Sequence, residues 1–430
     1  MRRYPSYKDS GVEWIGEIPS HWEETKHKFL IDVLSGYPFK SELFDPVEGF
    51  PIIRIRDITS GKIETFYTGE IIEDFIVKKG DLLVGMDGDF NIRWWDSEEG
   101  LLNQRCCSIK EGKGVLRRYL FYILPFELQI INDLTYFTTV KHLSVSDIKN
   151  TSTVHPSLPE QTQIVSYLDR KTEGIDKLIE TKVRKIELLK EYRTSLISKV
   201  VTKGLNPNVK MKDSGIEWIG EIPEHWGVKN IKHHSEVNVG LVINPSTYFD
   251  EYGTIPIITG KNVKVTGIDL GEVDKITEES NELLWKTKIY EDDLVSMRVG
   301  YPGRTSVVKK SENGINCCSV IITRKSKSII SKLLELQLNS KIGEIQVELC
   351  QGGMGQKVVN LSDWNEFKVI SPPLSEQTQI VSYLDEQTQL IDKNIQTEEK
   401  KIELLKEYRQ SLISEVVTGK IKVSNDEEVH

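Results

Sequence analysis

The sequence predicts an α+β protein in which two mixed, mainly β domains are each followed by a long helix. Three observations support this prediction: an internal repeat, short β-branched runs between turn residues, and two heptad patterns. The ten residues 160–169 recur unchanged at 376–385, and the nine residues 185–193 recur at 401–409. The chain is therefore expected to fold as two related halves about a pseudo-twofold axis.

The repeat also sets the expected domain boundaries. A Gly-, Pro- and Trp-rich stretch, here called the Trp motif, occurs at 8–22 and again at 212–226. We expect a first domain at 1–157, a first long helix at 158–204, a second domain at 205–373, a second long helix at 374–420 and a tail at 421–430.

The stretches between the repeated parts diverge in sequence but share one pattern. Short β-branched runs at 51–55, 81–84, 255–258 and 293–295 are separated by Gly, Asp and Asn, which is typical of a mainly β domain. Each domain is also expected to contain one helical piece, near 115–134 in the first half and near 328–349 in the second.

Each long helix shows a series of residues, six of the eight apolar, at alternating spacings of three and four, which is the pattern of a coiled coil. The first series is Ile175, Ile179, Lys182, Ile186, Leu189, Arg193, Leu196 and Val200, and the second is Ile391, Ile395, Glu398, Ile402, Leu405, Arg409, Leu412 and Val416. Each helix would run about 40 residues, or roughly 60 Å. Pairing as an antiparallel coiled coil is favoured over separate surface helices, and Lys182 should then meet Glu398.

The composition is that of an ordinary water-soluble chain, with 38% hydrophobic and 28% charged residues. No stretch approaches the roughly 18 consecutive apolar residues of a membrane span, and residues 1–5 do not resemble a signal peptide, so we expect a cytoplasmic protein. The formal net charge of −9 argues against a simple basic nucleic-acid-binding chain. A nucleic-acid reader of this charge would need local basic patches or a partner that neutralises phosphates.

The five cysteines form no metal-binding or disulfide pattern. Successive strand residues point to opposite faces, so at most one residue of Cys106-Cys107 and of Cys317-Cys318 is expected to face the core. The two pairs also serve as an expected alignment mark between the two domains.

Motifs for catalysis are missing from the sequence. There is no phosphate-binding G-x-x-x-x-G-K-[ST] run, no G-x-G-x-x-G after a strand, and the 371–374 run lacks the pattern of an amino-group methyltransferase. Glu111-Gly112-Lys113 downstream of acidic residues resembles a nuclease pattern only loosely and is more typical of a surface turn. The sequence favours binding and scaffolding over catalysis.

Two duplicated motifs resemble those of the specificity subunit of type I restriction-modification systems. The first is Trp-Ile-Gly-x-Ile-Pro-x-x-Trp at 14–22 and 218–226. The second is Leu-Pro/Ser-Glu-Gln-x-x-Ile-Val-x-x-Leu-Asp at 158–169 and 374–385. Their alternation matches this family over essentially the whole chain.

The resemblance implies a DNA-recognition subunit that is not itself an enzyme. Each domain would be a target-recognition domain that reads one half of a split, asymmetric double-stranded DNA target, and the helices would set the spacer. Two methylation subunits and the restriction/translocase subunits would be partners. S-adenosylmethionine and ATP are expected on those partners, and no cofactor is expected in this chain.

Candidate DNA-contacting residues are polar or aromatic side chains in loops beside strands, where they could reach base edges or phosphates. In the first domain they are Asp89, Asn91, Arg93 and Trp94 within segment 86–95, Lys141, and, with weaker support, Arg54 and Arg56 on one expected strand face. In the second domain they are Arg298, Tyr301 and Arg304, then Gln356 and Lys357, and, with weaker support, Lys261 and Asn262.

Each of these assignments has an alternative. Segment 86–95 could be a hairpin whose tryptophans cover the core, and the strand face that carries Arg54 and Arg56 could simply be solvated. Lys141 and Lys357 align in otherwise different loops, which favours phosphate contact over base reading.

Three other functions remain open from the sequence. An unrecognised enzyme is the least favoured, and cofactor-independent turnover by the isolated chain would support it. The other two are binding functions. One is the recognition subunit of a related methyltransferase or nuclease system that lacks an ATP-driven motor, which partner genes would decide. The other is a coiled-coil adaptor that binds only proteins. Sequence-specific retention on DNA in the presence of partner subunits separates the adaptor from a DNA reader.

Overall fold

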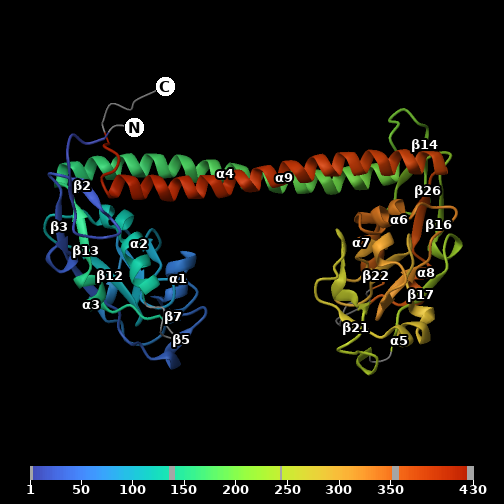
Figure 1. Cartoon of the computed structure of the whole chain (residues 1–430), viewed down its shortest axis with the longest axis horizontal. Coiled ribbons are helices and arrows are strands. Elements are labelled where there is room, and N and C mark those ends of the chain that lie inside the picture. Colours follow the sequence, from blue (N-terminus) through green and yellow to red (C-terminus); the bar gives the residue numbers. More distant parts are fainter. Residues whose placement is uncertain (1–2, 135–140, 243–244, 351–357, 424–430) are drawn as a thin grey trace. The chain divides into compact units, whose positions relative to one another are not determined.

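The computed structural model describes residues 3–134, 141–242, 245–350 and 358–423. The chain divides into two compact units, Met1–Lys182 with Lys400–His430 and Val183–Glu399. Each unit combines one mainly β domain with parts of two long helices, α4 (Leu158–Lys203) and α9 (Leu374–Val417) (Figure 1). The predicted fold class is confirmed. Among the described residues, no helix is long and apolar enough to span a membrane.

The first unit contains thirteen strands and three shorter α-helices within its described residues. Its strands are β1 (Tyr7–Asp9), β2 (Glu17–Pro19), β3 (Glu23–Lys26), β4 (Ile31–Ser35), β5 (Phe44–Asp45), β6 (Phe50–Ile53), β7 (Phe66–Tyr67), β8 (Ile76–Val77), β9 (Leu82–Gly85), β10 (Ile92–Trp94), β11 (Gly100–Leu102), β12 (Cys106–Glu111) and β13 (Ser152–His155). Its shorter helices are α1 (Ile55–Ser60), α2 (Arg117–Leu134) and α3 (Val145–Asn150).

The central sheet of the first unit has the order β10-β9-β12-β4 and is antiparallel throughout. A second sheet, β5-β7-β6-β11-β8, includes one parallel pair, β6 with β11. Helix α2 packs on β10 and β12. The main core lies on this helical side and the smaller core, with Trp95 and Ile58, lies on the other face of the sheet.

The expectation that only one cysteine of each pair faces the core is wrong. Cys106 and Cys107 are both completely buried, Cys106 in the smaller core and Cys107 in the main core. Cys317 and Cys318 are likewise both buried, in two different clusters. The two side chains of each pair do point in opposite directions, as predicted. Both are buried because apolar side chains cover both sides of the chain there.

The second unit contains thirteen strands and four shorter α-helices within its described residues. Its strands are β14 (Met211–Asp213), β15 (Glu221–Pro223), β16 (Gly227–Asn230), β17 (Val237–Val239), β18 (Ile255–Ile258), β19 (Val263–Lys264), β20 (Gly267–Ile268), β21 (Asp274–Ile276), β22 (Leu294–Met297), β23 (Thr305–Val307), β24 (Asn316–Cys317), β25 (Val320–Thr323) and β26 (Lys368–Ser371). Its shorter helices are α5 (Glu278–Leu283), α6 (Ser331–Leu338), α7 (Lys341–Leu349) and α8 (Leu361–Asn365).

The second unit repeats the topology of the first. Its main sheet, β17-β25-β22-β23, corresponds to β4-β12-β9-β10, and its parallel pair β18 with β24 corresponds to β6 with β11. Strand β16 pairs with β26 as β3 pairs with β13. Two different sequences therefore fold onto one strand framework.

The cysteine pairs are not equivalent positions, so the alignment based on them is wrong. Cys106 lies opposite Gly85, whereas Val320 occupies the matching place opposite Met297 in the second unit. Cys317 of β24 pairs with Ile258 of β18, and the equivalent pair in the first unit is Leu102 of β11 with Ile53 of β6. Small apolar side chains fit many buried strand positions, which makes cysteine a poor marker of register.

The second expected helical piece is two helices. Helix α6 ends at Leu338 and α7 begins at Lys341, with Asn339 and Ser340 between them. The Asn339 side chain accepts a hydrogen bond from the Thr305 amide at 3.0 Å and donates to the Thr305 carbonyl at 2.8 Å. Asn339, between the two helices, therefore connects them to β23. The apolar periodicity of the sequence could not predict this interruption.

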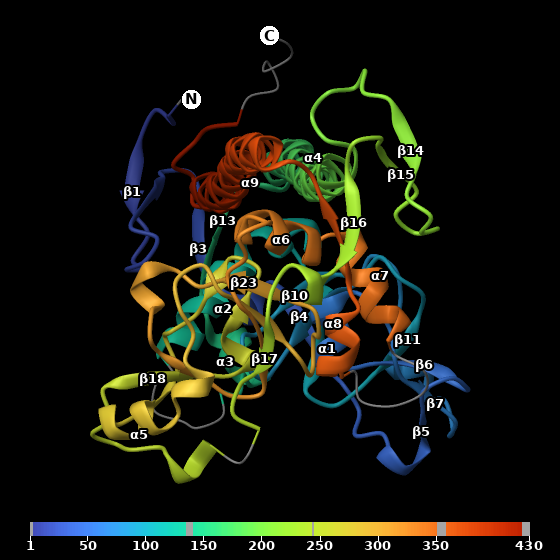
Figure 2. The ribbon, with the colours of Figure 1, turned by 90° about the vertical axis from the view of Figure 1, so that its right-hand side faces the viewer.

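Within each unit the long helices run antiparallel (Figure 1), and the end-on view of Figure 2 shows them side by side. In the second unit Lys185 pairs with Glu398 at 2.9 Å and Arg193 with Asp392 at 3.0 Å. A later residue of α4 thus pairs with an earlier residue of α9, as antiparallel helices require. In the first unit Arg409 pairs with Asp176 at 2.9 Å. Lys182 belongs to the first unit and Glu398 to the second, so their contact stays a prediction.

The repeated Glu-Gln pair explains why the start of each long helix is constant. Gln161 is fully buried; it accepts from the Leu116 amide at 2.8 Å and donates to the carbonyls of Gly114 and Pro156, both at 2.9 Å. Gln377 repeats this pattern with Ile330, Ser328 and Pro372. The glutamine holds the β domain against the first turns of its helix.

Candidate nucleic-acid interface

Two loops that are distant in sequence meet in the first unit. The Gly88 amide donates to the Lys141 carbonyl at 3.1 Å, and the Leu143 amide donates to the Met86 carbonyl at 2.7 Å. Asp87 and His142 form an isolated antiparallel bridge between the loops. The structure thus brings together Lys141 and segment 86–95, which the sequence proposed as separate candidates.

Charged side chains gather where these loops meet. The Asp87 carboxylate lies 2.7 Å from His142 Nδ1 and 3.7 Å from the Arg105 guanidinium. Arg105 is exposed and adopts a φ of 68°, a left-handed conformation that non-glycine residues rarely take. Sequence reasoning missed Arg105. The sequence feature that could have identified Arg105 is a basic residue directly before the buried strand β12.

The matching loops of the second unit meet in the same way. Val299 bridges to Val358, the Val359 amide donates to the Arg298 carbonyl at 3.0 Å, and Arg298 Nε donates back to the Val359 carbonyl at 3.3 Å. Gln356 and Lys357, like residues 138–140 of the first loop pair, lie outside the described residues.

Much of segment 86–95 supports the fold. Arg93 donates to the carbonyls of Ile58 and Thr59 at 2.5 and 2.8 Å, which satisfies the end of helix α1. Trp95 is fully buried and donates to the Glu98 carbonyl. Trp94 is half-buried and packs against Phe121. Asp89 is exposed and Asn91 half-exposed, and these two remain free to face a ligand.

Arg54 and Arg56, the weaker candidates of the first domain, do not lie on a strand, so the prediction that they share one strand face is wrong. Strand β6 ends at Ile53, and the chain turns into α1 because Asp57 accepts from the Arg54 amide at 2.8 Å. Arg56 is half-exposed beside Thr65 and Glu64. An acidic side chain three residues after the turn is a helix-start signal that the β-branched run obscured.

The second unit uses the same local turn. Asn262 accepts from the Thr259 amide at 3.0 Å, in the short 3-10 helix Gly260–Asn262. Its side-chain amide donates to the carbonyls of Asp269 and Glu272, and only 4% of the residue is exposed. Asn262 therefore holds the loop together, while Lys261 of the same turn is exposed.

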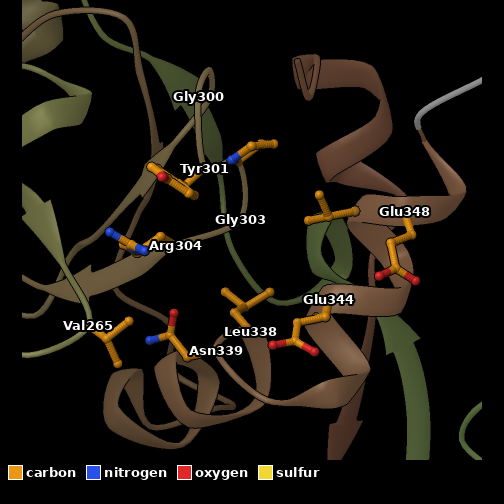
Figure 3. Close-up of a pocket in the computed structure, with 12 residues that line it drawn as sticks. Val265, Gly300, Tyr301, Gly303, Arg304, Leu338, Asn339, Glu344 and Glu348 are labelled. Atoms are coloured by element: carbon orange, nitrogen blue, oxygen red, sulfur yellow. The ribbon is translucent and has the colours of Figure 1, made fainter. Parts of the chain in front are cut away.

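A cavity of the second unit lies at the predicted loop. It has a volume of about 620 Å³ and is lined by Tyr301 and Arg304 on one wall and by Glu344 and Glu348 of α7 on the other (Figure 3). The Arg304 guanidinium lies over the Tyr301 ring at 4.8 Å, and Tyr301 is 68% exposed.

This arrangement suits contact with bases. An exposed aromatic ring can stack, a guanidinium can donate twice to guanine, and carboxylates can accept from the cytosine amino group. The sequence pointed to Tyr301 and Arg304, but it did not point to the acidic wall, because Glu344 and Glu348 lie on a separate helix. Within the described ranges, no group of three or more His, Cys, Asp or Glu side chains could hold a metal ion.

Comparisons with known proteins agree with this architecture. The chain matches the family model described as type I restriction modification DNA specificity domain twice, at residues 19–188 and 223–407. The two matches span most of the chain and include both β domains. The chain therefore belongs to the type I restriction-modification DNA specificity family, and DNA recognition is the function of this class.

Individual relatives cover nearly the whole chain. It is 29% identical to the Type I restriction enzyme EcoBI specificity subunit of Escherichia coli, over 88% of this chain and 81% of that protein. It is 26% identical to the putative type I restriction enzyme MjaX specificity subunit of Methanocaldococcus jannaschii, over 95% and 96%.

Solved structures share the fold. A chain from a study of complex assembly and conformational transition of the type I R-M system matches with a TM-score of 0.69 at 17% identity, covering 94% of this chain and 99% of that one. The HsdS subunit from Thermoanaerobacter tengcongensis matches with a TM-score of 0.52 at 17% identity, covering 94% and 98%.

Proposed function

We propose that this chain is the non-catalytic specificity subunit of a cytoplasmic type I restriction-modification complex, and that each β domain reads one half of a split, asymmetric DNA target. The observation that carries this proposal is the pair of meeting loops. At and beside these loops the first unit presents Asp87, His142 and Arg105, whereas the second presents Arg298, Tyr301 and Arg304. One scaffold with two different surfaces suits two different half-sites.

The long helices would set the unread spacer between the half-sites. Helix α4 has 46 residues, which corresponds to roughly 69 Å at 1.5 Å per residue. Such a length is compatible with two reading domains held about one or more DNA turns apart, at roughly 34–36 Å per turn.

Two methylation subunits would dock on the repeated helix segments. Leu188 and Tyr192 in one copy, and Leu404 and Tyr408 in the other, are each about half exposed although they are large and apolar. Exposed apolar residues spaced four apart on a helix form one stripe suited to a partner. These subunits would carry S-adenosylmethionine, and restriction/translocase subunits joined to the complex would carry ATP.

The partners also account for the acidic chain. With a formal net charge of −9, this subunit would contribute base contacts and a few cations, and the methylation subunits would neutralise most phosphates. The isolated chain should then bind DNA weakly and with a shallow dependence on salt, because it neutralises few phosphates.

A domain exchange tests this proposal. Residues 24–157 are replaced by those of a relative, the chain is assembled with its methylation subunits, and methylated bases are mapped on a random DNA library. We expect one split motif, of which only one half changes after the exchange. A complex that methylates without any motif, or a motif that changes in both halves, would contradict the two-reader proposal.

A further inference from the structure

The first unit buries a tyrosine between the Trp motif and the start of α4. Tyr4 is 7% exposed, and its hydroxyl donates to Glu160 Oε1 at 2.7 Å. Its ring packs edge-on against Trp22 with centroids 6.1 Å apart and lies 5.6 Å from the His21 ring. Trp22 and His21 bind the same carboxylate, at 3.2 and 2.9 Å. Three side chains thus share one glutamate.

The second unit has the same frame without the tyrosine. Trp226 donates to Glu376 at 3.0 Å, and His225 lies 2.7 Å from the same carboxylate. The position that matches Tyr4 in the repeat is Asn208, which is exposed. The Glu376 side chain is 35% exposed, against 18% for Glu160.

A cavity remains where the tyrosine would be. Its volume is about 270 Å³, and Trp226, His225, Glu376 and Ile380 line it together with Leu205 and Val209. Leu205, Val209 and Ile380 supply apolar contacts, and Glu376 is the one carboxylate among the lining residues. Lys203, Asn206 and Gln379 make the rest of the lining polar. Gly204 closes one side with a φ of 71°, and a Cβ there would lie 3.0 Å from the Trp226 ring, so the wall is tightly built.

We propose that this cavity takes a tyrosine side chain from a docked methylation subunit, a statement that rests on the function proposed above. The phenol hydroxyl would donate to Glu376 and the ring would pack against the edge of Trp226, as Tyr4 does in the first unit. A phenylalanine would further bury the carboxylate without adding a hydrogen bond to those of His225 and Trp226, which is less favourable. The segment 205–210, which passes the cavity, contains no aromatic residue of its own.

The chemistry of the cavity is tested first on the full chain. The protein is labelled with 5-fluorotryptophan and titrated with p-cresol, which reproduces the tyrosine side chain, and with toluene, which lacks the hydroxyl. We expect a saturable shift of the Trp226 fluorine resonance with p-cresol, at least five-fold weaker binding of toluene, and no response at Trp22.

Two test variants and one control variant make this titration decisive. Tyr4→Ala should open the matching cavity in the first unit and give Trp22 the same response. Val209→Phe should fill the second cavity and abolish the response of Trp226, whereas Val183→Phe on exposed helix surface should preserve it. An unchanged Trp226 resonance, equal binding of toluene and p-cresol, or an undiminished response in Val209→Phe would overturn the proposal.

The source of the tyrosine is tested in the assembled complex. A photo-crosslinking amino acid replaces Val209, and the crosslinked peptides are identified by mass spectrometry. A crosslink to a tyrosine-bearing segment of a methylation subunit supports the proposal. A crosslink to the Tyr4 segment of a second copy, or none in an assembled complex, overturns it. Failure of the complex to assemble counts against the proposed function instead, and the titration still decides what the cavity binds.

Discussion

At the scale of single residues, the candidate arginines differ in whether their guanidinium groups are already used inside the protein. Arg93 caps the carbonyl end of α1 through Ile58 and Thr59. Arg304 has a ring contact with Tyr301 at the mouth of an open cavity. The two residues have the same chemistry but different surroundings, so their substitution should have different consequences.

Arg93→Ala and Arg304→Ala form a matched pair for this comparison. We expect Arg93→Ala to lower the free energy of unfolding by about 1.5–3 kcal/mol, because hydrogen bonds from a charged group are lost. Arg304→Ala should leave the free energy of unfolding nearly unchanged. It should lower the discrimination against wrong bases in the half-site read by the second domain by about 1–3 kcal/mol. Urea unfolding and methylation mapping measure the two effects. An unstable Arg304→Ala protein with an unaltered motif would remove Arg304 from the interface.

His234 is a second residue whose surroundings decide its behaviour. Burial, reinforced by the nearby charges of Lys229 and His233, lowers the pKa of His234 below its ordinary value. Its ring nitrogens lie 2.8 Å from the Ser328 hydroxyl and 2.9 Å from the Ser371 hydroxyl. The neutral imidazole is therefore the form that the folded state favours.

This shift predicts a loss of stability in acid. The unfolded chain takes up the proton first, near a pH of about 6.5, so the contribution of His234 to stability falls as the pH drops from there to the lower folded pKa. Below the folded pKa the loss levels off. Urea unfolding at several pH values should show a smaller decline in His234→Gln than in wild type, with exposed His233→Gln as the control. Identical declines in wild type and His234→Gln would refute this assignment.

At the scale of elements, the repeated glutamines are the joints between helices and β domains. Gln161 and Gln377 are both fully buried. Each makes three hydrogen bonds to backbone groups of its own β domain, two ahead of α2 or α6 and one just ahead of the long helix. This explains why the helix start is constant while the domains diverge. A backbone contact does not depend on the side chains of the partner segment.

Removing either glutamine should loosen one joint only. Gln161→Ala leaves an amide and two carbonyls without their partner in a buried site, and we expect a loss of about 3 kcal/mol in the stability of the first unit. Gln377→Ala should do the same in the second unit. Hydrogen exchange, read separately for residues of each unit, measures the effect, and exposed Gln163→Ala is the control. Equal loss of protection in both units would argue against separate joints.

At the scale of the whole molecule, the exposed leucine and tyrosine pairs make a prediction about stoichiometry. Leu188→Ala with Tyr192→Ala, or Leu404→Ala with Tyr408→Ala, should each remove one of two methylation subunits, and all four changes should remove both. Native mass spectrometry counts the subunits. Leu283→Ala with Trp285→Ala, which removes a similar exposed pair from the second β domain, should leave the count at two. Undiminished stoichiometry in the fourfold variant would place the docking surface elsewhere.

Part of the candidate interface could be predicted from the sequence. Polar and aromatic residues in loops after buried strands pointed to Tyr301 and Arg304, and both line an open cavity. The same pattern pointed to Arg93 and Asn262, whose side chains are used inside the protein. The residue type shows which side chains can bind a base. Whether such a side chain is already hydrogen-bonded inside the protein depends on neighbours from other parts of the chain.

The sequence by itself determined the internal repeat, the alternation of β domains and long helices, and the family, because these depend on periodicity and on local motifs. The tertiary structure alone decided that β12 is buried on both faces, that α1 interrupts the expected strand at Ile55, and that the loops at 86–88 and 141–143 meet. It also decided that Tyr4 fills a cavity whose counterpart in the second unit is open. Such features depend on which distant segments supply the covering side chains, and no local pattern records that.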